Sequence, residues 1–251
     1  MFSSERLVLV LSLLLAHACL VEAGTILVPQ DQPTVQDAID AAVNGDVVQV
    51  SPGTYVENIN FLGKAITVTS SDGPEVTIID GNMNGPVVTF ASGEALDSVL
   101  EGLQIINGSG NPDNPAPRGG GIFCSLSSPT IANNIITENS VGCPVSHSSF
   151  GGGIYCESSS PTITGNTLSN NISREGGGIY CIDASPIIEN NIIHGNSCGP
   201  GGAVGGGIVS VFSSSPWIIG NVITENGAIL GGGIACVSLG LEANPIISDN
   251  L

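Results

Sequence analysis

The hexapeptide GGGIYC, at residues 151–156 and again at 176–181, decides the fold of this 251-residue chain. Near-copies begin at residue 119 (GGGIFC), residue 205 (GGGIVS) and residue 231 (GGGIAC), so the motif returns every 25 to 32 residues. Each copy is followed by a second string, PxIxxNx(I/L/V)xxN, which begins at residues 129, 161, 186 and 216 and is present in part at 245 as PIISDNL. A repeat of this length is one small structural unit, and it is stable only when it stacks on its neighbours.

The repeat predicts short β-strands separated by sharp bends. Apolar residues alternate with period two, as Ile154 and Cys156 do, which is typical of strands and not of helices. The residue before each repeated asparagine is, in successive copies, Asn133, Gly165, Asn190, Gly220 and Asp249. These residue types adopt a positive φ with little strain, so we expect a bend there in every copy.

Stacked coils of such strands form a parallel β-helix, in which equivalent residues lie about 4.8 Å apart along the axis. We expect the isoleucines to form an inward column: Ile131, Ile163, Ile188, Ile218 and Ile247. The repeated asparagines are expected to pass amide hydrogen bonds from coil to coil: Asn134, Asn166, Asn191, Asn221 and Asn250. The cysteines of the motif are predicted to form a column of small buried side chains: Cys124, Cys156, Cys181 and Cys236.

The amino-terminal part fits the same architecture less regularly and adds about two coils, for about seven in all. Residues 33–42 place Val35, Ala38, Ile39 and Ala42 on one helical face, and Asn44-Gly45 marks a stop. The predicted fold is therefore all-β: a right-handed parallel β-helix whose amino-terminal end is capped by an α-helix.

Both ends of the chain suggest processing or truncation. Residues 1–23 carry Arg6, an apolar run and a small-residue ending, which predicts a signal peptide and a single β-helix domain over 24–251. We therefore expect a secreted, periplasmic or cell-surface protein, with simple cleavage favoured over lipid anchoring at Cys19. No later apolar run is long enough to span a bilayer. Because the sequence stops in the middle of a coil at residues 248–251, we expect a fragment truncated at the carboxyl end.

Charge and cysteine spacing exclude several functions. With 4 basic and 22 acidic side chains the formal net charge is −18, so nucleic acid and anionic membranes are poor partners. No cysteine pair has CxxC spacing, so we predict no metal site and no cofactor, although abundant acidic and amide oxygens leave calcium open. A disulfide between Cys143 and Cys198 also stays open, and we expect a monomer.

At this point the chain resembles the secreted right-handed parallel β-helix repeat proteins of the pectate-lyase-like superfamily. The likeness covers essentially all of residues 24–251, including the opening TILVPQDQPTVQDAIDAAVNGDVVQVSPGTYVENINF at 25–61. The resemblance implies the fold, but it does not imply one activity, because the superfamily includes lyases, hydrolases, esterases, adhesins and scaffold proteins.

The catalytic signatures of that superfamily carry over poorly. Residues 53–58 (GTYVEN) are similar to the GxYxE opening of pectin methylesterases, but no QDF-type motif follows, and the chain has no Asp-Asp pair like that of polygalacturonases. Pectate lyases use an arginine or lysine base, for which Lys64, Arg118 and Arg174 are available. On the edge with variable loops, Arg118 or Arg174 could clamp a substrate carboxylate or act as base, and His147 could act as acid or base. The alternative is that all three are solvated loop residues.

The residue between the isoleucine and the cysteine of each motif should point outward, which gives Phe123, Tyr155 and Tyr180 on three successive coils. An exposed aromatic row would be a platform for stacking sugar rings, whereas the alternative is cross-strand packing. We therefore predict a non-catalytic secreted or surface β-helix that displays this face to a polysaccharide, a cell-surface glycan or another partner. The alternative is a carbohydrate-active enzyme, a polysaccharide lyase or glycoside hydrolase acting on acidic polysaccharide.

Overall fold

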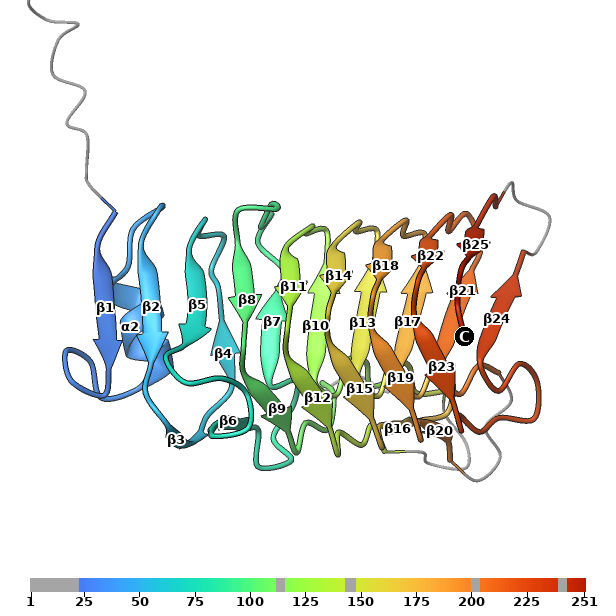
Figure 1. Ribbon diagram of the computed structural model, residues 1–251, viewed down its shortest axis with the longest axis horizontal. Helices are drawn as coiled ribbons and strands as arrows, with labels where there is room; N and C mark the ends of the chain where they lie inside the picture. The colour runs from blue at the N-terminus through green and yellow to red at the C-terminus, as the bar shows by residue number, and fades with distance from the viewer. Residues whose placement is uncertain (1–22, 112–115, 143–147, 200–203, 239–242) are drawn as a thin grey trace, which may run out of the picture.

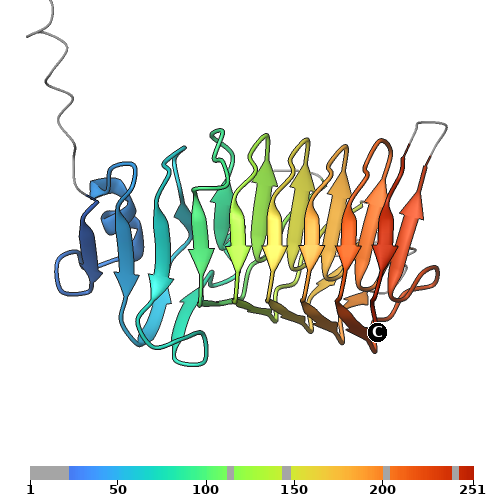
Figure 2. The same cartoon turned by 45° about the horizontal axis from the view of Figure 1, so that its top comes forward.

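The protein is a parallel β-helix in which the chain winds through three sheets in turn, as the two views of the computed structural model show (Figures 1 and 2). The structure describes residues 23–111, 116–142, 148–199, 204–238 and 243–251. Coils follow one another along the long axis from the amino-terminal to the carboxyl-terminal end (Figure 1). The all-β fold with an amino-terminal helix is confirmed.

Within the described residues, the strands form one nine-stranded sheet, two seven-stranded sheets and a two-stranded sheet. The nine-stranded sheet contains β1 (Thr25–Val28), β2 (Val47–Val50), β5 (Thr67–Ser70), β8 (Val99–Glu101), β11 (Thr130–Ala132), β14 (Thr162–Thr164), β18 (Ile187–Glu189), β22 (Trp217–Ile219) and β25 (Ile246–Ser248). We call the next sheet along the chain the asparagine-side sheet, and it contains β3 (Gly53–Val56), β6 (Thr77–Asp80), β9 (Gln104–Ile106), β12 (Ile135–Thr137), β15 (Thr167–Ser169), β19 (Ile192–His194) and β23 (Val222–Thr224). We call the last one the glycine-side sheet, and it contains β4 (Ile59–Asn60), β7 (Val88–Phe90), β10 (Ile122–Ser125), β13 (Ile154–Glu157), β17 (Ile179–Ile182), β21 (Ile208–Val211) and β24 (Ile234–Val237). The two-stranded sheet pairs β16 (Ile172–Ser173) with β20 (Ser197–Cys198). Every described strand pair is parallel, so each repeat of the sequence supplies one strand to each large sheet.

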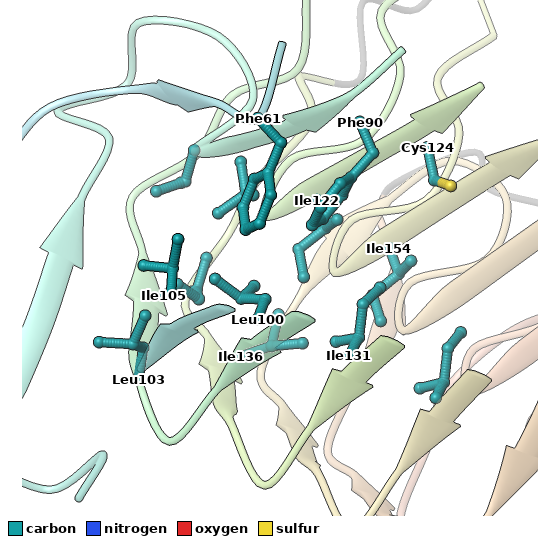
Figure 3. Packing of buried hydrophobic residues seen from close by; sticks show 14 of the residues in the cluster. Phe61, Phe90, Leu100, Leu103, Ile105, Ile122, Cys124, Ile131, Ile136 and Ile154 are labelled. Carbon is teal, nitrogen blue, oxygen red and sulfur yellow. The ribbon is translucent and has the colours of Figure 1, made fainter. Parts of the chain in front are cut away.

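The core consists of the inward columns that the repeat predicts. On the nine-stranded sheet Ile163 pairs in register with Ile131 below and Ile188 above, and all three are fully buried. On the glycine-side sheet Phe61 and Phe90 pack with their ring centroids 4.3 Å apart, and Cys124 continues their column (Figure 3). The cysteine column is thus a continuation of an aromatic one, and Cys124, Cys156 and Cys181 are buried as expected. Cys236 and Ile247, which we expected to be buried in these columns, are exposed.

Two asparagine ladders run up the inside of the helix. In the predicted ladder, Asn166 Oδ1 accepts a hydrogen bond from the Asn134 backbone N–H (2.9 Å), and Asn166 Nδ2 donates to the Ile131 carbonyl (2.9 Å) and to Asn191 Oδ1 (3.0 Å). A second ladder of the same design contains Asn139, Asn171, Asn196 and Asn226. Each amide satisfies buried backbone groups at a bend, where strand pairing leaves them unpaired.

The predicted bends have the backbone conformation expected from their residue types. Asn133, Asn190 and Asp249 have φ of 55°, 56° and 56°, and Gly165 and Gly220 have φ of 66° and 65°. Asparagine, aspartate and glycine therefore alternate at one position because each tolerates the left-handed region.

The triple glycine marks a corner where a side chain does not fit. A Cβ on Gly177 would lie 2.7 Å from the backbone nitrogen and oxygen of Ser197 and 2.8 Å from the Gly206 carbonyl oxygen of the next coil. The first glycine of each motif also has a positive φ, 65° at Gly151, which reverses the chain onto the strand that follows.

Helix α2 (Val35–Ala41) covers the amino-terminal end of the core, as predicted, with Val35, Ala38 and Ile39 buried. Two side chains from later in the sequence hold its ends. Glu57 accepts the backbone N–H groups of Val35 (3.0 Å) and Gln36 (2.8 Å). Lys64 Nζ donates to three carbonyl oxygens at the other end, those of Ile39, Asp40 and Ala42, at 2.7 to 2.9 Å.

This arrangement gives the GTYVEN segment a structural role. A carboxylate at a helix amino terminus and an ammonium at its carboxyl terminus both interact favourably with the helix dipole. In the part of the chain that the structure describes, no helix has the length and apolarity needed to cross a membrane.

Candidate functional site

The aromatic row of the glycine motif points away from the core, as predicted, but it is not exposed. Tyr155 and Tyr180 are only 1 % and 5 % exposed, and Phe123 is half-buried. The three rings stack with centroids 5.6 and 5.8 Å apart and planes within 5° of parallel. They belong to a second apolar cluster outside the main core, so the prediction of an exposed platform is wrong.

The residue just before each triple glycine covers this row. Those residues are Arg118, Phe150, Glu175, Val204 and Leu230, and isolated parallel bridges join them from coil to coil. The positive φ of the first glycine turns this pre-glycine column back over the strand that follows. The Phe150 ring centroid lies 4.8 Å from that of Tyr180, and Arg118 Cζ lies 5.4 Å from the Tyr155 ring centroid. Tyrosine rings under such a cover cannot stack on a sugar unless the column moves.

Arg118, a candidate base or carboxylate clamp, is held in place by the protein itself. Its Nη1 lies 3.1 Å from Glu157 Oε2 on the neighbouring coil, while its guanidinium covers the Tyr155 ring. Burial raises the pKa of Tyr155 strongly, against a smaller opposing effect of Arg118. Arg118 therefore links its own coil to the next one through an ion pair and a cation–π contact.

The other catalytic candidates are not brought to Arg118. Arg174 precedes Glu175, which lies two coils from Arg118 in the bridge column, or roughly 10 Å along the axis. Its backbone N–H donates to Ser149 Oγ (2.9 Å). His147 and Cys143 lie outside the described residues, so the roles of His147 and of a Cys143–Cys198 disulfide stay predictions. Burial raises the pKa of Glu175, with Arg174 acting in the opposite direction.

A buried carboxylate, which the sequence did not single out, has a structural role. Glu94 is 2 % exposed and accepts hydrogen bonds from the Gly63 and Ser92 backbone N–H groups (both 2.8 Å) and from Ser127 Oγ (2.7 Å). Burial alone would raise its pKa, but the hydrogen bonds from Ser127, Ser92 and Gly63 outweigh burial and hold the pKa below its ordinary value of 4.5. Glu94 therefore fixes a corner between coils as an anion.

The buried thiols are not arranged as metal ligands. Burial raises the pKa of Cys124, and a hydrogen bond with Cys181, together with burial, raises the pKa of Cys156. Protonated thiols bind metals weakly. Among the residues that the structure describes, no three histidine, cysteine or acidic side chains converge as a metal site would require.

An exposed apolar surface lies elsewhere, on the outer face of the nine-stranded sheet near the carboxyl-terminal end. Trp217 is 51 % exposed and pairs in register with Ile187 (37 %) on β18 and Ile246 (46 %) on β25. Ile219, two residues further along β22, is partly exposed on the same outer face. We call these four residues, Ile187, Trp217, Ile219 and Ile246, the Trp217 patch.

The sequence held the signal for this patch. The residue after the repeated proline points outward in every copy. Along the axis this position is occupied in turn by Thr130, Thr162, Ile187, Trp217 and Ile246. The outer face therefore passes from threonine to large apolar side chains. Large apolar side chains exposed side by side on neighbouring strands are unusual on the surface of a folded protein. Contiguous patches of this kind are typical of interaction sites.

The surroundings of the patch are acidic. Glu189 follows Ile187 by two residues on β18, so both side chains leave the same face of the sheet. Asp249, which is exposed, directly follows β25, whereas the Asp183 carboxylate accepts a hydrogen bond from the Ser213 backbone N–H (3.4 Å). The basic residues in the described parts of the chain are Lys64, Arg118 and Arg174, and the first two are held at helix α2 and at the glycine-side sheet.

Comparison with known proteins agrees with the architecture. No curated protein sequence matches the chain. A family described as "Right handed beta helix region" matches residues 76–251, well over half of the sequence. That span contains all five glycine motifs and all five proline–asparagine strings. The chain therefore belongs to the right-handed β-helix family.

Proposed function

We propose that this protein is a non-catalytic β-helix, secreted or displayed at the cell surface, that binds polysaccharide on its outer face through the Trp217 patch. One observation carries the proposal: Trp217 is half exposed although its strand is paired on both sides, and the outward Ile187 beside it is also exposed. Aromatic side chains combine a large apolar face with little conformational entropy to lose, which suits them to stack on sugar rings.

The rigidity of the support favours binding at this face. The backbone under Trp217 is paired on both sides, and the inward neighbour Ile218 is fully buried. A surface that is already ordered loses less conformational entropy when a ligand binds, so more of the interaction energy remains as affinity. Three strands also span roughly 10 Å along the axis, which extends the patch along a chain-like ligand.

The contacts that the Lys64 and Arg118 side chains make within the protein favour a binding role over a catalytic one. Lys64 binds three helix carbonyls and Arg118 binds Glu157, so both of these basic side chains already bind protein groups. A lyase base has to be available to the substrate proton. Secretion is supported by the signal-like residues 1–23.

The aromatic row has a structural role in this proposal. Phe123, Tyr155 and Tyr180 pack under the pre-glycine column and stabilise the glycine-side sheet, which is the cross-strand alternative. In this proposal the ligand contacts the nine-stranded sheet instead of the glycine-side sheet.

The test is a binding panel of neutral, acidic and amino polysaccharides, run with the parent, Trp217→Ala and Thr162→Ala. Thr162 occupies the same outward position as Trp217 two coils away, so Thr162→Ala is a matched control. We expect Trp217→Ala to lower affinity by at least about tenfold at an unchanged melting temperature, with Thr162→Ala unaffected. A parent that binds none of the panel, or equal binding by Trp217→Ala, would contradict the proposal.

The same panel also tests the enzymatic alternative. Release of unsaturated or reducing oligosaccharides by the parent, lost in Arg118→Ala or Arg174→Ala, would replace binding by lyase or hydrolase activity as the function. We expect no release, and we expect Arg118→Ala to lower the melting temperature because it removes the contacts to Glu157 and Tyr155.

A further inference from the structure

We infer that the Trp217 patch selects polysaccharides that carry ammonium groups, as unacetylated amino sugars do, over neutral chains and over uronates. The inference rests on the proposed function, because it names the chemical class of ligand for the same surface. It is carried by the position and the free state of one carboxylate, Glu189, beside an exposed aromatic ring.

Glu189 and Trp217 lie diagonally across two neighbouring strands. Glu189 pairs in register with Ile219, and Ile187 pairs with Trp217, so Glu189 and Trp217 occupy opposite corners of a four-residue square on one outer face. In a parallel pair such diagonal neighbours lie roughly 8 Å apart, within reach of long side chains. A sugar ring stacked on Trp217 therefore presents a ring substituent toward the Glu189 carboxylate.

Within the described residues, the Glu189 carboxylate is available to a ligand. Glu101 lies in the same outward column three coils earlier and accepts a hydrogen bond from Asn133 Nδ2 (3.0 Å). At Glu189 the equivalent bend residue of the next coil is Gly220, which has no side-chain amide. Among the described residues no hydrogen bond or ion pair to the Glu189 carboxylate is formed, so it keeps its capacity to pair with a ligand cation.

The charge of the whole protein acts in the same direction. A formal net charge of −18 attracts cationic chains and repels polyuronates over a distance set by the ionic strength. Locally, the exposed Asp249 directly follows β25 at the edge of the patch. A uronate carboxylate near Trp217 would be repelled by Glu189 and Asp249, whereas an ammonium would pair with Glu189.

The experiment compares glucosamine oligomers, fully N-acetylated glucosamine oligomers and polygalacturonate, at a pH where free amino groups are protonated. The proteins are the parent, Trp217→Ala, Glu189→Gln and Glu75→Gln, the last a matched loss of one exposed charge far from the patch. We expect Glu189→Gln to weaken binding of the glucosamine oligomer about threefold to fivefold and to leave the acetylated oligomer unchanged. Glu75→Gln should match the parent, and added salt should shrink the preference for amino sugars.

Other outcomes separate this inference from the proposed function. Equal affinity for free-amine and acetylated oligomers, or no effect of Glu189→Gln, overturns the inference and leaves polysaccharide binding standing. Binding of no oligomer overturns both. Poly-lysine is included as a probe of charge alone: if it binds as tightly as the glucosamine oligomer and Trp217→Ala changes neither, the surface is a general site for cationic polymers and the inference is overturned.

Discussion

Replacing Asn191 by leucine should lower the free energy of unfolding of the β-helix. The reason is that the Asn191 side chain forms hydrogen bonds with the coils on both sides of it. Its Oδ1 accepts the Asn166 backbone N–H (2.9 Å) and an Asn166 amide hydrogen (3.0 Å). Its Nδ2 donates to the Ile163 carbonyl (2.9 Å) and to Asn221 Oδ1 (3.0 Å). Asn191 is 1 % exposed, so water cannot replace these bonds.

The four hydrogen bonds set the magnitude. Each contributes about 0.5 to 1.5 kcal/mol net, and the orphaned Asn166 N–H adds a desolvation cost of about 1 to 3 kcal/mol. The greater apolar surface of leucine offsets part of this loss, which leaves a destabilisation of about 4 kcal/mol. For a domain of this size that corresponds to a decrease of roughly 8 to 16 °C in melting temperature.

The assay is thermal unfolding followed by circular dichroism at one scan rate, with Asn190→Gly as the matched control. Asn190 is the adjacent, exposed bend residue with φ of 56°, and the chain itself uses glycine at this position in Gly165 and Gly220. We expect the control to melt within a few degrees of the parent. If Asn191→Leu melted like Asn190→Gly, the ladder would not hold the coils together and the reasoning would be refuted.

Three further perturbations test other parts of the structure. Gly177→Ala should lower the melting temperature strongly, because its Cβ would lie 2.7 Å from backbone atoms of Ser197. Gly142→Ala, whose Cβ would have no atom within 4 Å, should melt like the parent. Equal melting temperatures of the two variants would contradict the close backbone approach at Gly177. Lys64→Met should speed amide hydrogen exchange in helix α2 without unfolding the distant coils, and unchanged exchange there would show that the ammonium does not hold the helix end. The low folded-state pKa of Glu94 means that its stabilisation is present above the ordinary value of 4.5 and is lost as pH falls through the lowered pKa. The melting difference between the parent and Glu94→Gln should therefore shrink in acid, and a difference that stays constant with pH would contradict this role.

The repeat in the sequence was enough to predict the inward columns, because burial of Ile163 or Cys156 depends only on register between identical neighbours. It also predicted the bends, since Asn190 and Gly220 share one conformational requirement. Contacts between unlike segments were not predictable in the same way. Glu57 and Lys64 hold helix α2 from 21 to 25 residues away, and no local pattern encodes that pairing.

The exposure of the aromatic row was mispredicted for a related reason. Period-two alternation places Tyr155 outside the core, but it does not say what lies on top of it. The cover comes from Phe150 and Arg118, whose position depends on the positive φ of the glycine that follows each of them. On the nine-stranded sheet the outward residue Trp217 stays half exposed.

The most direct measurement is the fluorescence of Trp217 during titration with polysaccharide, because the sequence contains a single tryptophan. Emission from the protein then reports on one residue of the proposed binding face. The account predicts a saturable change in emission, with the same dissociation constant as calorimetry gives, and protection from an aqueous quencher in the bound state. Saturable binding by calorimetry with no change in Trp217 emission or quenching would contradict the claim that this face of the β-helix binds the ligand.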